Sequence, residues 1–566
     1  MASGAGAGAA SWIRSVSLCL AALCAFGQFD HDLWTPDEPR VGAVGKSVAE
    51  GHWIAPRLGD EPFLEEPPLH AWCVGLVYRV FGHDHPSIAR LVSLLFGAGG
   101  LVVTYFLARQ LAGPRAGWLA ALSLGISLEY LSTSHRVVVD GALTFFTTAS
   151  AVACWRGAVA RDVHSAARWL ILSQCLAVLA FLTKGPIGLA FPALAWVASS
   201  FASRTPLPAA ASRLAVYCLA LLIAFSLIAG PWLFLLHRET GATGLTELLL
   251  DNTLGRILPA AEGSRSHLRP FWYYFLYLPV HLFPATLFVA GAAADRWRRR
   301  AELESRERIA YDFGLAWLAL GLAMLTLAST KRAIYLLPIF PAAAIAAGVW
   351  LDRFLDGRAD GAFDRLVGHL MSASLLAAAI ALLTAAFFIE GASWLPPFAG
   401  LAAVMTALAA GGALQPRASR PSPRLLQAWM FSFCALALAA KFSLVPAVDA
   451  VKSLAQPARY VARMVPSERP LYAFAPDETT VAMFQLYTER RLEPLADLAA
   501  LRARLEKEGY LDVLVVEKHG VWPPAPPAEG KDPSPLLELP RLEPEILYRE
   551  VREDSRAFLL LGFRKR

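Results

Sequence analysis

The chain has 566 residues, of which 56% are hydrophobic and only 17% are charged. A soluble domain seldom exceeds about half apolar residues and carries about a quarter charged ones, so this composition excludes a soluble globular protein and indicates a polytopic membrane protein. The net charge of +6 is small for the length and no basic stripe with interleaved aromatic residues occurs, which argues against nucleic acid as a partner.

About thirteen apolar runs are long enough to cross a membrane as helices, for which about 20 largely apolar residues are needed. They are residues 12–28, 88–110, 115–133, 140–159, 167–183, 186–202, 213–236, 271–293, 311–328, 332–351, 365–389, 395–414 and 424–442. The segment LHAWCVGLVYRVFG (69–82) is too short to span and is expected to form an interfacial helix. Residues 1–442 are therefore predicted to form an α-helical membrane domain.

The arginine-rich loops set the expected orientation, because positively charged loops stay on the cytoplasmic side. With a cytoplasmic N-terminus, the loops that fall inside are rich in arginine: 109–115, 156–168, 296–308 and 420–424. The first loop (29–87), the loop 237–270 and everything after about residue 443 then face the outer compartment.

The last stretch, residues 443–566, has the pattern of a small α/β domain. Strands are expected at LYAFA (471–475) and DVLVVEK (512–518), with helices near 477–488 and 495–508 between them. Two further strands, near 546–551 and 556–564, are expected to pair as a hairpin. The stretch contains no glycine-rich phosphate loop. We therefore expect a structural or acceptor-recruiting role, and no nucleotide cofactor.

A dense group of carboxylates follows the first apolar run, in FDHDLWTPDEPR (29–40). Thr35 is a candidate N-cap and Pro36 a candidate first helical residue, so Asp37 and Glu38 are expected in the first turn of a helix. A carboxylate there can complement the helix dipole, or it can face a molecule bound at the membrane surface. Both interpretations stay open at this point.

Further charged side chains fall at the outer ends of the predicted spans or in the outer loops. They are Glu65, Glu66, Asp140, Lys184, Arg256, His267, Arg269, Lys331 and Arg332. Lysine and arginine at membrane ends often only extend toward water, but the positive-inside rule makes outer cations unusual. A surface with both signs suits a phosphorylated lipid, with cations for the phosphate and carboxylates for the other reactant.

Six motifs occur in the order found in one family. They are LWTPDEPR, GHWIAPRLGDEPFLEEPPLHAW, HRVVVDGALTFF, LTKGPIGLAFP, DNTLGRIL with HLRPFWYYF, and STKRAIYLLPIFP. On these motifs the chain resembles the bacterial members of the protein O-mannosyltransferase superfamily, especially the aminoarabinose transferases that modify lipid A. The resemblance implies a GT-C glycosyltransferase of the bacterial inner membrane with thirteen spans and a small periplasmic α/β domain at its C-terminus.

Enzymes of this kind take a sugar from a polyprenyl-phosphate carrier and pass it to an acceptor at the membrane surface. The acceptor implied here is a lipid A-like glycolipid, another envelope glycan or a protein. Asp37 matches the acidic residue of the family's reaction centre, and Asp140 matches its second acidic position, so both are expected to be catalytic. Asp37 is then the general base of an inverting displacement when the acceptor is a hydroxyl.

The resemblance also implies binding residues for the two substrates. They are Glu38, Arg40, Glu66, Lys184, Arg256, Arg269, Lys331, Arg332 and Tyr335. Glu65 and His267 correspond to a divalent-metal pair. One position departs: the aminoarabinose transferases carry lysine where this chain has Glu66. Because a carboxylate cannot ligate a phosphate as an ammonium does, aminoarabinose is not assigned as the sugar.

Two other classes of protein compete with the enzyme. A polytopic transporter or flippase usually places its ionisable groups near the middle of the membrane, on broken helices, whereas the charges here gather at one surface. An inactive homologue that acts as an assembly partner is the second rival. The presence of Asp37, Asp140 and Lys331 argues against it.

Overall fold

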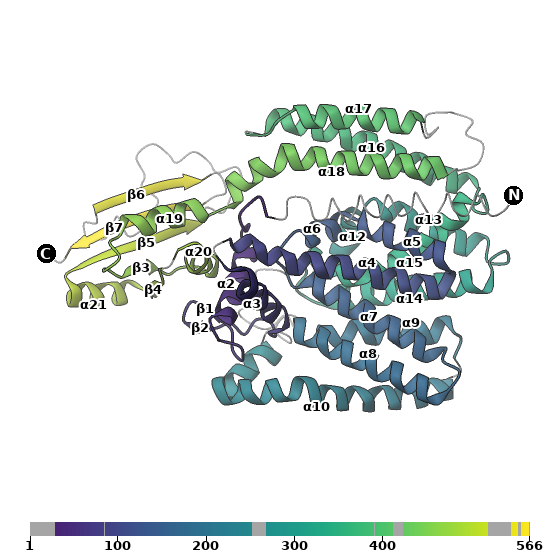
Figure 1. Cartoon of the computed structure of the whole chain (residues 1–566), viewed down its shortest axis with the longest axis horizontal. Helices are drawn as coiled ribbons and strands as arrows, with labels where there is room; N and C mark the ends of the chain where they lie inside the picture. Colours follow the sequence, from purple (N-terminus) through teal and green to yellow (C-terminus); the bar gives the residue numbers. More distant parts are fainter. Residues whose placement is uncertain are drawn as a thin grey trace. The chain divides into compact units, whose positions relative to one another are not determined.

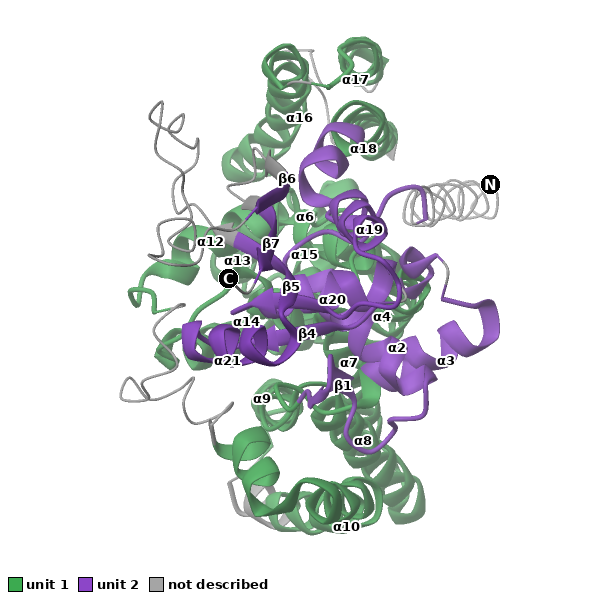
Figure 2. Ribbon diagram, turned by 90° about the vertical axis from the view of Figure 1, so that its left-hand side faces the viewer, with its two compact units in different colours: residues 1–28, 64–70, 90–445 green, residues 29–63, 71–89, 446–566 purple. Residues whose placement is uncertain are grey.

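The computed structural model of the chain describes residues 29–251, 268–410, 423–518, 545–552 and 556–564, apart from positions 84, 206, 390 and 489. The chain divides into two compact units (Figure 2). The described part of unit 1 lies within residues 64–70 and 90–445. Unit 2 is built from residues 29–63 and 71–89 together with the described part of 446–566. Most of the predicted first outer loop therefore belongs to the same unit as the C-terminal domain.

Unit 1 is helical (Figure 1). Its helices are α4 (Arg90–Ala112), α5 (Pro114–Gly125), α6 (Leu128–Ser134), α7 (Asp140–Ala158), α8 (Val163–Lys184), α9 (Ile187–Ala202), α10 (Leu207–Thr246), α12 (Tyr273–His281), α13 (Ala285–Arg298), α14 (Ser305–Leu327), α15 (Phe340–Leu355), α16 (Ala362–Phe388) and α17 (Leu395–Ala410). A π-helical turn, η2 (Glu247–Asp251), follows α10, and a 3-10 segment, η4 (Ala333–Ile339), precedes α15. The helix α18 (Pro423–Lys452) holds the last residues of unit 1 and the first residues of the C-terminal part of unit 2.

Seven of the described helices are long and apolar enough to cross a membrane, and eight are if the bent pair α12 and α13 forms one span. The prediction of a multi-pass α-helical protein is thereby confirmed. The total of thirteen spans stays a prediction. The run 12–28 lies outside the described residues, and the runs 186–202 and 395–414 form shorter helices, α9 and α17.

Two of the predicted spans are interrupted. The run 115–133 is divided between α5 and α6, and the run 271–293 between α12 and α13, which are bent by 109° relative to each other. Pro284 stands at this second break, as the N-cap of α13. Proline lacks a backbone N–H and disfavours helical geometry in the residue before it, which accounts for the interruption.

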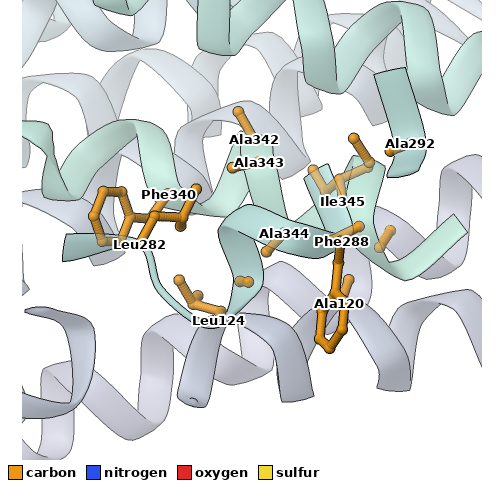
Figure 3. Close-up of a cluster of buried hydrophobic side chains, with 14 of the residues drawn as sticks. Ala120, Leu124, Leu282, Phe288, Ala292, Phe340, Ala342, Ala343, Ala344 and Ile345 are labelled. Atoms are coloured by element: carbon orange, nitrogen blue, oxygen red, sulfur yellow. The ribbon is translucent and has the colours of Figure 1, made fainter. Parts of the chain in front are cut away.

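The centre of unit 1 is α15, in which every residue except Asp352 is buried. Figure 3 shows alanines of this helix among the side chains of the buried cluster. In a membrane, helices associate largely through van der Waals packing, and small residues let their backbones approach closely. At Gly348 an added Cβ would lie 2.6 Å from the Ala116 oxygen and the Ala120 nitrogen of α5. The alanine-rich sequence of α15 therefore sets how closely α5 packs against it.

A buried ionic network joins α13, α14, α15 and α16. Arg353 is 2% exposed and donates to Asp295 over 2.8 Å and to Glu307 over 2.7 Å. Arg299 donates over 2.7 Å to both Asp295 and Asp364. Each buried charge of this network thus has an oppositely charged partner, which offsets the cost of its burial.

Unit 2 combines short elements of the first loop with a five-stranded sheet. The first-loop elements are α2 (Asp37–Ala49), the hairpin β1 (Arg57–Leu58) and β2 (Glu61–Pro62), most of α3 (Leu69–Phe81), and η1 (Pro86–Ala89). The C-terminal elements are α19 (Ala455–Met464), β3 (Leu471–Phe474), α20 (Glu478–Tyr487), β4 (Leu492–Leu495), α21 (Leu498–Glu508), β5 (Tyr510–Lys518), β6 (Glu545–Arg552) and β7 (Arg556–Arg564).

The sheet has the strand order β4-β3-β5-β7-β6. The strand β3 pairs in parallel with β4 and β5, whereas β7 pairs antiparallel with β5 and β6. The predicted strands at 471–475, 512–518, 546–551 and 556–564 are confirmed, including the hairpin. The edge strand β4 was not predicted, because LEPL is short and carries a proline, which is tolerated in a strand mainly at a sheet edge.

Candidate active site

Asp140 and Lys184 form an ion pair in unit 1. Asp140 is the first residue of α7 and Lys184 is the last residue of α8, and these two helices pack against each other. A carboxylate suits a helix N-terminus and an ammonium suits a helix C-terminus, so each charge also complements its own helix dipole. Lys184 Nζ donates to Asp140 Oδ1 over 2.6 Å, and only 11% and 6% of the two side chains are exposed.

Lys184 is surrounded by two further predicted site residues. Its Nζ lies 4.8 Å from the centroid of the Tyr335 ring, a distance typical of cation–π contacts. The charge of Glu66 attracts the same ammonium. The structure therefore brings together Glu66, Asp140, Lys184 and Tyr335, which come from four separate segments of the sequence. Lys184 is already balanced by carboxylates and is not an isolated cation.

A second group of predicted residues lies where the segment before α12 meets the segment before η4. Leu268 and Thr330 form an antiparallel bridge there. The bridge brings Arg269 next to Lys331 and Arg332. Since Tyr335 N donates to Arg332 O over 3.1 Å, this cationic group continues directly into the η4 segment that carries Tyr335.

Lys331 is the most buried member of this cationic group, with 4% of the residue exposed. Its Nζ donates to the carbonyl oxygens of Arg269, over 3.3 Å, and of Ala328. Among the described residues no carboxylate pairs with it. Burial lowers the pKa of the Lys331 ammonium, since loss of solvation disfavours the charged form. An anion bound beside Lys331 would remove this penalty.

Tyr274 was not predicted, yet it lies in the same part of unit 1. It is 0% exposed, and its hydroxyl makes no hydrogen bond to any described residue, although it approaches the backbone of Arg332. It also interacts electrostatically with Tyr335 and Asp140. Buried hydroxyls normally have a partner, so a substrate atom is a candidate for that role. Nothing in the repeated tyrosines of HLRPFWYYF distinguishes this one in the sequence.

Asp37 lies in unit 2, at the first residue of α2. Arg40 Nη2 donates to Asp37 Oδ1 over 3.0 Å, and Arg40 Nη1 donates to Glu478 Oε2 over 2.5 Å. The Asp37 side chain is 22% exposed, so it is open to contact. The charge-assisted hydrogen bond from Arg40 therefore fixes the position of the Asp37 side chain.

The local structure of this helix start differs in part from the prediction. Asp37 and Glu38 lie in the first turn as expected, but α2 has Pro36 as its N-cap and no side chain caps it. The predicted cap by Thr35 is therefore wrong. Glu38 is 2% exposed and accepts a hydrogen bond from Trp34 N over 2.9 Å. Its carboxylate thus reaches back over the turn and holds the chain that leads into α2.

Two of the predicted site residues, Arg256 and His267, lie outside the described residues. The described part of the chain contains no group of three or more His, Cys, Asp or Glu side chains that could hold a metal ion. The pair of Glu65 and His267 is therefore not tested, and the divalent metal stays a prediction. The chemistry proposed below uses no metal.

Comparisons with known proteins show what this arrangement resembles. The family described as dolichyl-phosphate-mannose-protein mannosyltransferase matches residues 65–233, which include Glu66, Asp140 and Lys184. A protein from Edwardsiella ictaluri named undecaprenyl phosphate-alpha-4-amino-4-deoxy-L-arabinose arabinosyl transferase is 27% identical over 345 residues, or 59% of each chain. A protein of the same name, numbered 1, from Pseudomonas fluorescens is 27% identical over 361 residues, covering 62% of this chain and 60% of the relative. The match thus spans about three fifths of these relatives.

Solved structures extend the similarity over nearly the whole chain. The crystal structure of ArnT from Cupriavidus metallidurans in the apo state has a TM-score of 0.72, with 19% identity and 98% of both chains covered. The crystal structure of the same protein bound to undecaprenyl phosphate has a TM-score of 0.73, with 97% of this chain and 98% of that chain covered. The chain therefore has the fold of this protein, and the resemblance inferred from the six motifs is confirmed.

Proposed function

We propose that the protein is a membrane glycosyltransferase that moves a sugar from a polyprenyl-phosphate carrier to an envelope acceptor. The observation that carries the proposal is Lys331, a buried cation with no carboxylate partner among the described residues, next to Arg269 and Arg332. A lipid-linked phosphate supplies the missing negative charge, and guanidinium and ammonium groups are the usual phosphate ligands.

The names of the similar proteins support the carrier. The relatives from Edwardsiella and Pseudomonas are named for undecaprenyl phosphate-linked aminoarabinose, and one Cupriavidus structure is titled as bound to undecaprenyl phosphate. Glu66 stands where the aminoarabinose transferases carry lysine, and here its charge attracts Lys184. The proposal therefore covers the class of carrier, with a hexose or a pentose as the sugar.

In the proposed reaction, an oxygen of the acceptor attacks the anomeric carbon from the face opposite the carrier phosphate. The new carbon–oxygen bond forms as the bond to the phosphate oxygen breaks, with inversion. The electron pair leaves on the phosphate, where Arg269, Lys331 and Arg332 stabilise the additional negative charge. Asp37 takes the proton when the acceptor is a hydroxyl. A phosphate acceptor is already ionised, and Asp37 then only orients it.

Asp140 and Lys184 are proposed to hold the sugar. Because Lys184 balances its charge, the carboxylate of Asp140 can accept hydrogen bonds from sugar hydroxyls without leaving an uncompensated buried anion. The Tyr335 ring beside Lys184 and the unpartnered hydroxyl of Tyr274 complete this group. Glu38, Arg40 and Glu66 stay in the proposed substrate-binding set, as does Arg256.

The membrane arrangement is part of the proposal. The N-terminus faces the cytoplasm of a bacterium, thirteen helices span the inner membrane within residues 1–442, and the periplasmic domain occupies residues 443–566. The loop 237–270 contributes to substrate binding on the periplasmic side. The acceptor is a lipid A-like glycolipid, another glycan or a protein. The arginine-rich loops support this orientation through the positive-inside rule.

A transfer assay tests the proposal against its main rival, a lipid or sugar transporter. The full chain in lipid nanodiscs or liposomes is offered a panel of polyprenyl-phosphate sugars, with a membrane extract as the acceptor source. Transfer of one sugar, with release of the polyprenyl phosphate and loss of activity in Lys331→Gln, supports the enzyme. Movement of lipid or sugar across the liposome membrane, without turnover of any donor, supports the transporter. Absence of both activities supports an inactive assembly homologue.

A further inference from the structure

A cavity of about 110 Å³ lies within unit 2. It is lined by the end of α2 and the loop after it, by the β1–β2 hairpin, and by the end of α20 with the start of β4. The charged or imidazole side chains that line it are Lys46, Glu50, His52, Arg57, Asp60, Arg490 and Arg491. None of them belongs to the groups proposed above for sugar transfer.

Lys46 is buried in the wall of this cavity, with 8% of the residue exposed. Its Nζ donates to the carbonyl oxygen of Gln485, in the last turn of α20, over 2.8 Å. Carbonyl groups at a helix end favour a nearby cation, which accounts for part of the stability of this ammonium. Glu50 lies one turn further along α2, but within the described residues neither Glu50 nor any other carboxylate pairs with Lys46. Most buried charges are paired.

Arg57 is the second cation of the cavity that lacks an ionic partner. Its Nε is buried without a hydrogen-bond partner, and its Nη1 makes only a long bond of 3.4 Å to the carbonyl oxygen of Asp60. The backbone holds the residue in place, because Arg57 N donates to Ser47 Oγ over 2.7 Å. Unlike Lys46, the Arg57 guanidinium donates no hydrogen bond to the carbonyl groups of a described helix end. No described carboxylate forms an ion pair with it.

The remaining two arginines are already engaged. Arg491 pairs with Asp60 over 3.1 Å at the exposed rim, where both side chains are more than half exposed. Arg490 donates to the backbone carbonyl oxygens of Ala462, Val465 and Arg469, so its guanidinium fixes the segment between α19 and β3. The two cations of the cavity without a carboxylate partner among the described residues are therefore Lys46, which is buried, and Arg57, which is partly exposed.

We propose that this cavity binds a phosphate-class oxyanion between Lys46 and Arg57. An ammonium and a guanidinium together are typical ligands of such an anion. The cavity of about 110 Å³ has room for a phosphate group together with water. The carboxylates of Glu50 and Asp60 suit the hydroxyl groups of a molecule that carries this phosphate. The site does not depend on the transfer reaction.

The bound phosphate can be the free ion or part of a phosphorylated glycolipid of the envelope. Hydrogen exchange measured by mass spectrometry tests whether the cavity binds phosphate at all. The full chain in detergent is compared in inorganic phosphate and in chloride at equal ionic strength and pH. Exchange of the amides in residues 47–60 and 485–492 should slow in phosphate by about twofold when the phosphate concentration equals its dissociation constant.

Three variants separate a binding site from a general salt effect. Arg57→Gln should abolish the phosphate-specific slowing and leave the fold intact, because the guanidinium makes only one long hydrogen bond. Lys46→Met should abolish it too, and exchange in α2 and α20 reports whether that variant stays folded. Lys507→Gln, which changes an exposed lysine of α21 in the same unit, should keep the wild-type response. Wild-type amides that do not respond to phosphate, or an Arg57→Gln variant that responds fully, would overturn the proposal.

A second comparison identifies the source of the phosphate. The protein is placed in phosphatidylcholine nanodiscs with or without a monophosphorylated glycolipid, in buffer free of inorganic phosphate. If the glycolipid slows amide exchange in residues 47–60, and Arg57→Gln abolishes this effect, the ligand is a lipid headgroup. Slowing by inorganic phosphate alone supports a site for the free ion.

Discussion

Lys184 Nζ donates a hydrogen bond of 2.6 Å to Asp140 Oδ1, joining the last residue of α8 to the first residue of α7. The pair is almost fully buried, and the two residues are 44 positions apart in the sequence. The Lys184 ammonium is thus the shared partner of two carboxylates, Asp140 and Glu66. We therefore regard Lys184 as the central charge of the group that is proposed to hold the sugar.

The first prediction concerns this pair. Lys184→Met should lower the thermal stability of the protein and abolish transfer, because removal of one member of a buried ion pair leaves an uncompensated charge and costs about 3–5 kcal/mol. Asp140→Asn together with Lys184→Met should recover part of the stability and none of the activity. A double-mutant cycle on thermal unfolding in detergent measures the coupling. Additive losses of stability in the cycle would contradict the pairing.

The second prediction concerns Glu66. Glu66→Lys introduces the residue that the aminoarabinose transferases carry, but it replaces an attraction to Lys184 by a repulsion. Transfer should fall by more than in Glu66→Gln, by roughly fivefold for an electrostatic change of about 1 kcal/mol, the size expected for two charges well screened by water. Steady-state kcat/KM of the two variants measures the difference. Equal activity in both variants would show that the charge at this position does not act through Lys184.

The third prediction concerns the pH dependence of the cationic group. Burial lowers the pKa of Lys331, so its positive charge is lost at a lower pH than that of an exposed lysine. Carrier binding should therefore weaken as the pH rises toward this lowered pKa and stay strong below it. Lys331→Arg should bind the carrier over the whole range, because a guanidinium does not deprotonate in proteins. Binding of a polyprenyl phosphate, measured from neutral to alkaline pH, tests both statements. Identical alkaline loss in wild type and Lys331→Arg would exclude Lys331 as its cause.

The fourth prediction concerns packing at the centre of unit 1. Gly348→Ala should destabilise the protein by about 1–3 kcal/mol, because the added Cβ meets the backbone of α5 at 2.6 Å and overpacking has costs of this size. Gly230→Ala in α10 is the matched control, since its Cβ would come no closer than 3.7 Å to any other group. Thermal unfolding in detergent compares the two. A Gly348→Ala protein as stable as the control would show that α5 and α15 do not approach this closely.

The sequence made the fold class and several members of the site predictable. Hydropathy indicated the membrane helices, because a span has to be apolar along its whole length, and short apolar runs indicated most strands of the C-terminal sheet. The grouping of Lys331 and Arg332 was evident because they are adjacent. Their approach to Arg269 was not, since it depends on a single backbone bridge between Leu268 and Thr330.

Other features depend on tertiary contacts that no local pattern encodes. The pairing of Asp140 with Lys184 requires α7 and α8 to pack with these ends together. The importance of Tyr274 lies in a hydroxyl that is buried without a partner, and burial of one tyrosine in a run of aromatic residues cannot be read from the run. The cavity at Lys46 and Arg57 combines the first loop with residues more than 400 positions later, as the contact of Gly59 with Gln485 shows.

The central claim is that Asp37 takes part in sugar transfer, and one measurement tests it most directly. Turnover of the donor found in the panel is compared among wild type, Asp37→Asn and the control Glu468→Gln, which changes an exposed carboxylate of the same unit. All three proteins should fold alike and bind the carrier. The account predicts that Asp37→Asn loses about 10²–10⁴-fold in kcat for a hydroxyl acceptor, as expected for removal of a general base, while the control stays active. Wild-type turnover in Asp37→Asn with a hydroxyl acceptor would contradict the account.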